Sequence, residues 1–209
     1  MTTETKIPES IEKRDQEIVA IGISFIAYFL VAGMAVALLP NNPIAMSVGV
    51  VICLSFASMA LSLFYPNILT LTIPPISILT SAAVLGVMLN VILMGLKPDS
   101  HYIDIMSSLG VVGKITYLFL ACIVIPITEE IYFRGLLLPI ISRRFGVIVA
   151  VIVTLTLFVV NHGQWRTGLF SLCIQGAIYT WVSIRTGTPI TSIITHVTYN
   201  ATWFLLTFT

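Results

Sequence analysis

The sequence predicts an all-α protein, a polytopic transmembrane helical bundle of about seven spans. Of its 209 residues, 57% are hydrophobic and only 9% are charged, whereas an ordinary soluble domain is about 25% charged. The apolar residues gather in stretches that are long enough to cross a bilayer, which takes about 20 residues per helix. A net charge of +1, without a basic stripe, gives no sign of nucleic-acid binding.

The first predicted span follows a polar N-terminal tail. The tail is residues 1–17, and the apolar stretch after it is Ile18–Leu39. This stretch is longer than the core of a signal peptide, about 7–15 residues, and no small-residue cleavage pattern follows it. We therefore expect it to be retained, with residues 18–209 forming a single integral membrane domain.

Six further spans are predicted between prolines, charged residues and Asn/Gly clusters. They are Ile44–Tyr65, Ile76–Leu96, Ile115–Ile141, Gly146–Val160, Leu169–Ile184 and Ile190–Phe208. The long stretch Ile115–Ile141 contains Pro126 and Pro139, which should kink or break the helix. If the stretch splits there, the bundle has eight spans.

The basic residues of the short loops favour a cytoplasmic N-terminus. With seven spans, the cytoplasmic side holds Lys6, Lys13, Arg14, Arg143, Arg144 and Arg185, and the opposite side holds Lys97, Lys114 and Arg166. An eighth span would reverse everything that follows it. The sequence thus predicts an integral protein of a cell membrane with its N-terminus inside.

Three ionisable residues lie within six positions of the long apolar stretch: Glu129, Glu130 and Arg134. A charge at the bilayer centre costs about 2.5–3.5 kcal/mol on insertion scales. Glu130 and Arg134 are four positions apart on one helix face, where an ion pair lowers the cost of both charges. Glu129 points about 100° away and lacks a local partner, which suits a general base. Alternatively, the three residues only hold helices together.

Two histidines occur in later apolar stretches. His162 follows Phe158 by four positions and could accept a proton or orient a water, or could be an ordinary interfacial side chain at a span end. His196 and Asn200 are also four positions apart. Their donors could stabilise an oxyanion in a site that excludes water, or could form a hydrogen-bonded pair between helices.

The same residues raise the question of a metal. A catalytic zinc usually has three protein ligands and an open position, and Glu129, His162 and His196 could supply such a set from three helices. The sequence has no HExxH motif. Glu129 and His162 could equally activate a water without a metal, and we favour this hypothesis, in which no cofactor is required.

The three motifs together resemble those of the CAAX protease and bacteriocin-processing family of intramembrane endopeptidases, also called the Abi family. That family is marked by EExxxR, FxxxH and HxxxN on successive membrane helices. Here the motifs are Glu129-Glu130-x-x-x-Arg134, Phe158-x-x-x-His162 and His196-x-x-x-Asn200. Their order and spacing match the family within residues 115–208.

The resemblance implies a membrane-embedded protease that hydrolyses a peptide bond of a membrane-associated peptide or protein, as in CAAX processing or the maturation of bacteriocins and signal peptides. The residues it assigns to catalysis are Glu129, Glu130, His162, His196 and Asn200, with Arg134 and Phe158 in support. It makes Glu129 the general base and His162 its partner on the water. His196 and Asn200 would form the oxyanion site. The short chain and small loops are similar to the prokaryotic members, which implies a prokaryotic cell membrane.

A function of another class also fits the composition. The chain could be a non-proteolytic membrane immunity or regulatory protein whose polar cluster is structural. A transporter is disfavoured, because such folds often show matching broken helices in two halves. Here the polar residues lie in the C-terminal half and the prolines form no matching pair.

Overall fold

The computed structural model describes residues 42–94, 100–162 and 168–208, together with Val19, Gly22 and Ile26; it gives no side-chain description for residues 100–103 and 208. The predicted tail, residues 1–17, and most of the predicted first span, Ile18–Leu39, lie outside this part of the chain. The three described residues of that span are helical. The division of the chain into a tail and a single membrane domain stays a prediction.

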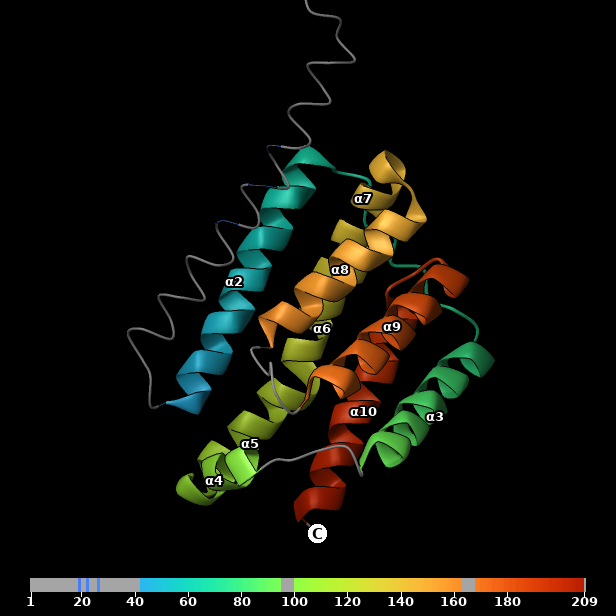
Figure 1. Cartoon of the computed structure of the whole chain (residues 1–209). Coiled ribbons are helices and arrows are strands. Elements are labelled where there is room, and N and C mark those ends of the chain that lie inside the picture. The colour runs from blue at the N-terminus through green and yellow to red at the C-terminus, as the bar shows by residue number, and fades with distance from the viewer. Residues whose placement is uncertain are drawn as a thin grey trace, which may run out of the picture.

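Every regular element in the described part of the chain is a helix, which confirms the predicted fold class (Figure 1). The α-helices are α2 (Pro43–Phe64), α3 (Ile76–Leu93), α4 (Ser100–Ser108), α5 (Val111–Phe119), α6 (Ile125–Glu130), α7 (Leu138–Phe145), α8 (Val147–Asn161), α9 (Leu169–Thr186) and α10 (Ile190–Phe208). Two π-helical segments, η2 (Leu120–Val124) and η3 (Ile131–Leu137), join α5 to α6 and α6 to α7.

Three of the described helices are long and apolar enough to cross a membrane. They are α2, α3 and the continuous helix Val111–Phe145, which has 35 residues. The helix α8 is apolar but shorter, with 15 residues. The helices α9 and α10 match predicted spans in length, but they carry many Ser, Thr and Gln side chains that are buried inside the bundle.

The long fourth stretch was predicted to kink or break at its prolines, and in the structure it does not break. Pro126 and Pro139 each stand at the second position of a new α-helical segment, directly after a π-helical segment. Proline has no N–H and its ring clashes with the carbonyl four residues earlier. A π turn widens the backbone and re-satisfies its freed groups, which is how membrane helices tolerate proline. The stretch therefore stays one helix, and no eighth span arises here.

The short helix α4 was not predicted. It occupies a polar segment between α3 and α5 that the sequence indicated only as a loop. The spans were assigned by long apolar stretches, and a nine-residue polar helix gives no such signal.

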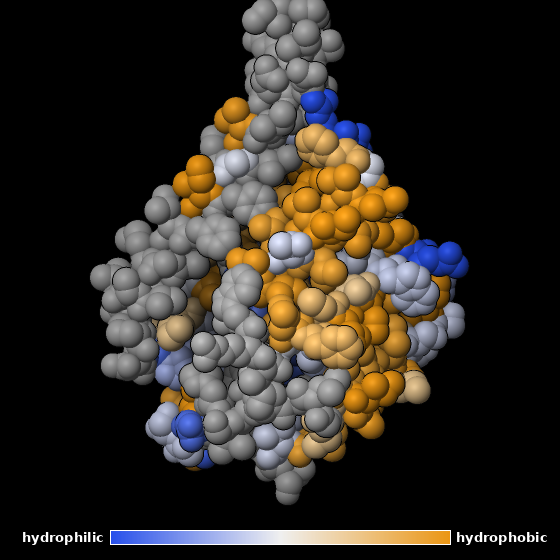
Figure 2. Space-filling view, viewed as in Figure 1, coloured by the Kyte–Doolittle hydropathy of each residue, from blue (hydrophilic) through white to orange (hydrophobic). Residues whose placement is uncertain are grey.

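The surface and the core of the described bundle follow the membrane pattern. Large apolar side chains of α3 are exposed, among them Val84, Met88, Val91 and Ile92. Apolar side chains also cover much of the face in Figure 2, with hydrophilic residues toward its margins. Soluble monomers rarely expose large contiguous apolar patches, whereas such a surface suits contact with lipid. Polar groups such as Thr195 are turned inward instead.

The helices α3 and α10 pack closely because α3 has a glycine at the contact. A Cβ atom on Gly86 would collide with the carbonyl of Thr195 and the hydroxyl of Thr198. One turn further along α3, the buried Asn90 donates its Nδ2 to the Tyr199 carbonyl of α10 at 3.0 Å. Small residues and interhelical hydrogen bonds are the usual means of helix association in membranes. This contact fixes the helix that carries His196.

We expect Gly86→Ala to destabilise the protein by about 1–3 kcal/mol, the usual cost of overpacking. The added methyl group meets backbone atoms of α10, which cannot turn aside. Thermal unfolding in detergent measures the effect. The matched control is Gly110→Ala, because a Cβ atom at Gly110 meets nothing within 4 Å. Equal melting temperatures for the two variants would show that the α3–α10 contact is looser than described.

Candidate active site

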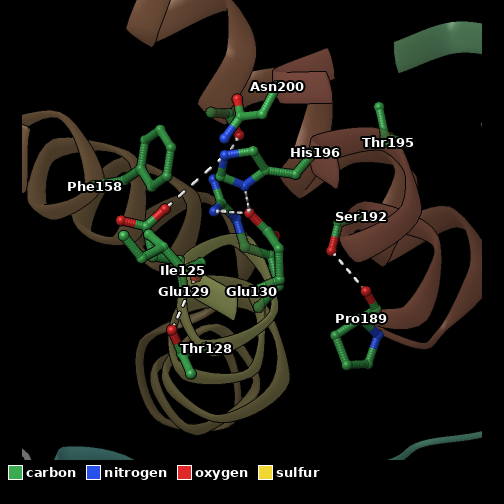
Figure 3. A network of polar contacts seen from close by, with 12 residues as sticks. Ile125, Thr128, Glu129, Glu130, Phe158, Pro189, Ser192, Thr195, His196 and Asn200 are labelled. Carbon is green, nitrogen blue, oxygen red and sulfur yellow. Dashed lines mark hydrogen bonds and ion pairs between the residues drawn. The ribbon is translucent and has the colours of Figure 1, made fainter. Parts of the chain in front are cut away.

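The polar residues of the predicted motifs come together from three parts of the described bundle (Figure 3). Glu129 and Glu130 end α6, His162 caps the end of α8, and His196 lies in α10. A turn at Gly146, whose φ of 85° favours glycine, reverses the chain between α7 and α8. Glu129 precedes this turn by 17 positions and His162 follows it by 16. Because the two helices are antiparallel, Glu129 and His162 lie at about the same level along the helix axes.

A second reversal aligns α9 with α10. Gly187, with a φ of 71°, ends α9 in the left-handed conformation and leads into α10. Tyr179 precedes this glycine by eight positions and His196 follows it by nine. Their rings stack with centroids 4.5 Å apart and an interplanar angle of 22°. The stack holds one face of the histidine ring.

The predicted ion pair between Glu130 and Arg134 is present and fully buried. Oε1 of Glu130 lies 2.8 Å from Nη1 of Arg134, and both side chains have 0% exposure. The guanidinium also donates to the Gly176 carbonyl at 3.1 Å and, through Nε, to Oγ1 of Thr180 at 3.4 Å. A Cβ atom at Gly176 would lie 2.6 Å from Cδ1 of Leu155 and 3.1 Å from Cδ1 of Phe158, so the missing side chain lets α9 pack closely against α8. The guanidinium is thus hydrogen-bonded to two helices, whereas Oε2 of Glu130 is buried and accepts no hydrogen bond within the described residues.

Glu129 occupies a different environment from its neighbour. Its side chain is buried, with the residue 3% exposed, and its carboxylate faces both histidines. Oε1 lies 4.0 Å from Nε2 of His162, and Oε2 lies 4.0 Å from Nε2 of His196. These separations exceed a direct hydrogen bond. Within the described part of the chain, Oε2 accepts no hydrogen bond, so this oxygen is free to act on another molecule.

Each histidine ring is oriented by a bond at Nδ1. Nδ1 of His196 lies 3.0 Å from Oε1 of Glu130, and Nδ1 of His162 lies 2.7 Å from the Phe158 carbonyl. An ionised carboxylate and a carbonyl can only accept, so both Nδ1 atoms carry a proton and donate it. Nε2 of each ring is then the atom that faces Glu129.

Phe158 supports both the ion pair and the histidines. The Arg134 guanidinium lies over its ring, 4.5 Å from the centroid. The rings of His162 and His196 have their centroids 4.5 Å and 6.1 Å from that of Phe158. The Phe158 ring thus packs against the buried cation and against both imidazoles, and it is fully buried itself.

Asn200 lies one turn beyond His196 on α10 (Figure 3). Its Nδ2 donates to the Ala121 carbonyl at 2.9 Å. Ala121 belongs to η2, in which the Ile125 N–H bonds to the carbonyl five residues earlier. In that register the Ala121 carbonyl would be served by residue 126, a proline without an N–H. Asn200 supplies the missing donor, and its amide has a second hydrogen for other use.

Sequence reasoning missed three residues of the site: Asn161, Tyr179 and Thr180. Asn161 donates from Nδ2 to Oε1 of Glu129 at 3.3 Å. Its only signal was its place directly before His162, where it marks the end of a span. Tyr179 and Thr180 gave no signal, because their contacts depend on how α9 aligns with its neighbours.

The ligand set considered for a metal has suitable donor types but wide spacing. Zinc binds nitrogen and oxygen at about 2.0–2.2 Å, which places two ligand atoms of a tetrahedral ion about 3.4 Å apart. The two separations between Glu129 and the histidine Nε2 atoms are both 4.0 Å. No group of three His, Cys, Asp or Glu in the described ranges is close enough to hold a metal ion.

The comparisons with known proteins identify the C-terminal part of the chain. Residues 111–202 match the family model described as type II CAAX prenyl endopeptidase Rce1-like. The matched segment runs from the start of α5 into α10 and contains all three motifs, which confirms the predicted family resemblance. No curated protein and no solved structure matches the chain. The apolar helices indicate an integral membrane protein, and residues 111–202 are similar to a family of proteases.

We expect Arg134→Met to lower the free energy of unfolding by about 3–5 kcal/mol, because it leaves the Glu130 carboxylate buried without a counter-ion. Adding Glu130→Gln to this variant should restore part of the loss. Denaturation in detergent measures both. The control is Arg144→Met, which removes an exposed guanidinium. A melting curve of Arg134→Met that matches the wild type would contradict the buried ion pair.

Proposed function

We propose that this chain, whose residues 111–202 match the CAAX prenyl endopeptidase family, is an intramembrane endopeptidase of a membrane-associated peptide or protein. The observation that carries the proposal is the position of Glu129, a buried carboxylate 4.0 Å from the Nε2 atoms of two histidines on different helices. A bundle that needed only structural polar contacts would have bonded these groups to one another. Their separation suits groups that act on a third molecule.

In this proposal Glu129 is the general base. It takes a proton from a water as the water attacks the peptide carbonyl carbon, a step in which a positioned base contributes about 10²–10⁴-fold. His162 is the partner of Glu129 on this water. Its Nδ1 donates to the Phe158 carbonyl, so the Nε2 of a neutral ring is an acceptor that can hold the second hydrogen of the water.

His196 and Asn200 are proposed to stabilise the oxyanion. Nδ1 of His196 already donates to Glu130, so Nε2 can donate to an oxyanion only when the ring carries a proton on both nitrogens. The Glu130 carboxylate beside Nδ1 stabilises that form of the ring, which gives the second glutamate an assisting role. The second amide hydrogen of Asn200 completes the donor pair. Oriented donors in a buried site are among the largest contributions to catalysis.

The family match favours a CAAX-type substrate, in which a prenylated cysteine lies near the C-terminus of the protein that is cut. The lipid group would keep such a substrate in the bilayer beside the exposed apolar helices. Bacteriocin or signal-peptide processing fits the same chemistry. The cytoplasmic N-terminus and the prokaryotic cell membrane belong to this proposal and rest on the charges and the small size of the loops.

The competing function is a non-proteolytic immunity or regulatory protein. The network around Arg134 would serve that protein equally well, because it joins helices whatever the function. Glu129 distinguishes the two functions. If Glu129 has a structural role, its replacement should mainly lower the stability of the protein. If Glu129 is the general base, its replacement should mainly lower the rate of cleavage.

We expect Glu129→Gln and His162→Ala to lower cleavage by at least about 100-fold while both proteins still insert, purify and melt near the wild-type temperature. Cleavage is measured on a fluorescence-quenched farnesylated CAAX peptide and, in cells, by comparing peptide termini between wild type and Glu129→Gln. The control is Asp104→Asn, which changes an exposed carboxylate. Wild-type cleavage in both variants would refute the assignment, and equal losses of stability and activity would favour the structural role.

We further propose that the reaction needs no metal. Elemental analysis of purified active protein should find far less than one metal ion per chain, and cleavage should survive a chelator. The reason is the wide spacing of the two histidines around Glu129. Stoichiometric zinc, together with activity that a chelator removes and zinc alone restores, would contradict this hypothesis.

A further inference from the structure

Asn161 donates the one hydrogen bond that the Glu129 carboxylate accepts within the described part of the chain. Its Nδ2 donates to Oε1 at 3.3 Å. None of the three sequence motifs includes it. Asn161 is the last residue of α8, and His162 caps that helix with its own N–H bonded to the Val159 carbonyl at 3.2 Å. The amide therefore reaches Glu129 from the end of α8.

The hydrogen bond makes the two oxygens of Glu129 unequal. Oε1 accepts from Asn161, whereas Oε2 is buried, accepts nothing in the described ranges and faces Nε2 of His196 at 4.0 Å. The terminal torsion of a glutamate is soft, so a carboxylate without a fixed donor turns freely. A charge-assisted hydrogen bond from Asn161 favours one orientation of the carboxylate.

We propose that Asn161 is a positioning residue for the reaction: it anchors Oε1 of Glu129 and so holds the carboxylate in the orientation in which it faces Nε2 of both histidines. This inference rests on the proposed function. The amide is suited to the task because it donates without adding a charge to the buried cluster. An aspartate of the same shape would present an acceptor to an acceptor and would push the carboxylate away.

The kinetic test uses Asn161→Ala and Asn161→Asp with the farnesylated peptide described above. Asn161→Ala should lower kcat about tenfold, the effect of one charge-assisted hydrogen bond, with KM unchanged. Asn161→Asp should lower kcat further, although it is nearly isosteric. The matched control is Asn42→Ala, which removes a side-chain cap of α2; it should lower the melting temperature and leave kcat unchanged. Unchanged kcat in both Asn161 variants, or a change in KM alone, would overturn the proposal.

A second measurement needs no turnover. In a double-mutant cycle of Asn161→Ala and Glu129→Ala, the melting temperature of the double variant should exceed the additive value by about 2–4 °C, because each single variant already loses the shared bond. Additive effects would overturn the anchoring of Oε1. If the wild type cleaves neither the peptide nor any protein in the cellular comparison of peptide termini but the cycle shows coupling, the proposed function fails while the anchoring of Glu129 stands.

Discussion

The buried ion pair between Glu130 and Arg134 is the interaction on which the rest of the site depends. Removing two charges from water is costly, and their attraction offsets that cost only when further hydrogen bonds complete the pair. Here the further partners come from other helices: the Gly176 carbonyl from α9 and Nδ1 of His196 from α10. The need to solvate one cation and one carboxylate therefore fixes how α9 and α10 approach the long helix.

The second constraint is the backbone of the long helix. Two prolines would ordinarily interrupt a span, but here a π-helical segment precedes each of them and the helix continues. At Pro126 the missing N–H leaves the Ala121 carbonyl for Asn200 to satisfy. A residue assigned to the oxyanion site thus also stabilises the helix that carries the proposed base. A movement of α10 that displaced Asn200 from the proposed oxyanion site would therefore also break its hydrogen bond to the Ala121 carbonyl.

The sequence predicts the fold well because membrane helices are defined by long apolar stretches. The helices α2 and α10 begin and end within one residue of the predicted spans. The Glu130–Arg134 pair is also predictable, since a spacing of four places both residues on one helix face. The π-helical segments could not be predicted. Helix propensities do not distinguish a hydrogen bond to the carbonyl four residues earlier from one to the carbonyl five residues earlier. Asn161 and Tyr179 depend on the alignment of helices after the two glycine turns, which no local pattern contains.

Adjacent glutamates on one helix have separate tasks because they point about 100° apart. Oε1 of Glu130 accepts from both Arg134 and His196 and is held between them. Glu129 turns toward Nε2 of the same histidine from the other side, at a distance too long for a bond. The ring of His196 therefore lies between one carboxylate that binds it and another that does not. A reaction needs both conditions: a ring that cannot turn, and a base that is not yet occupied.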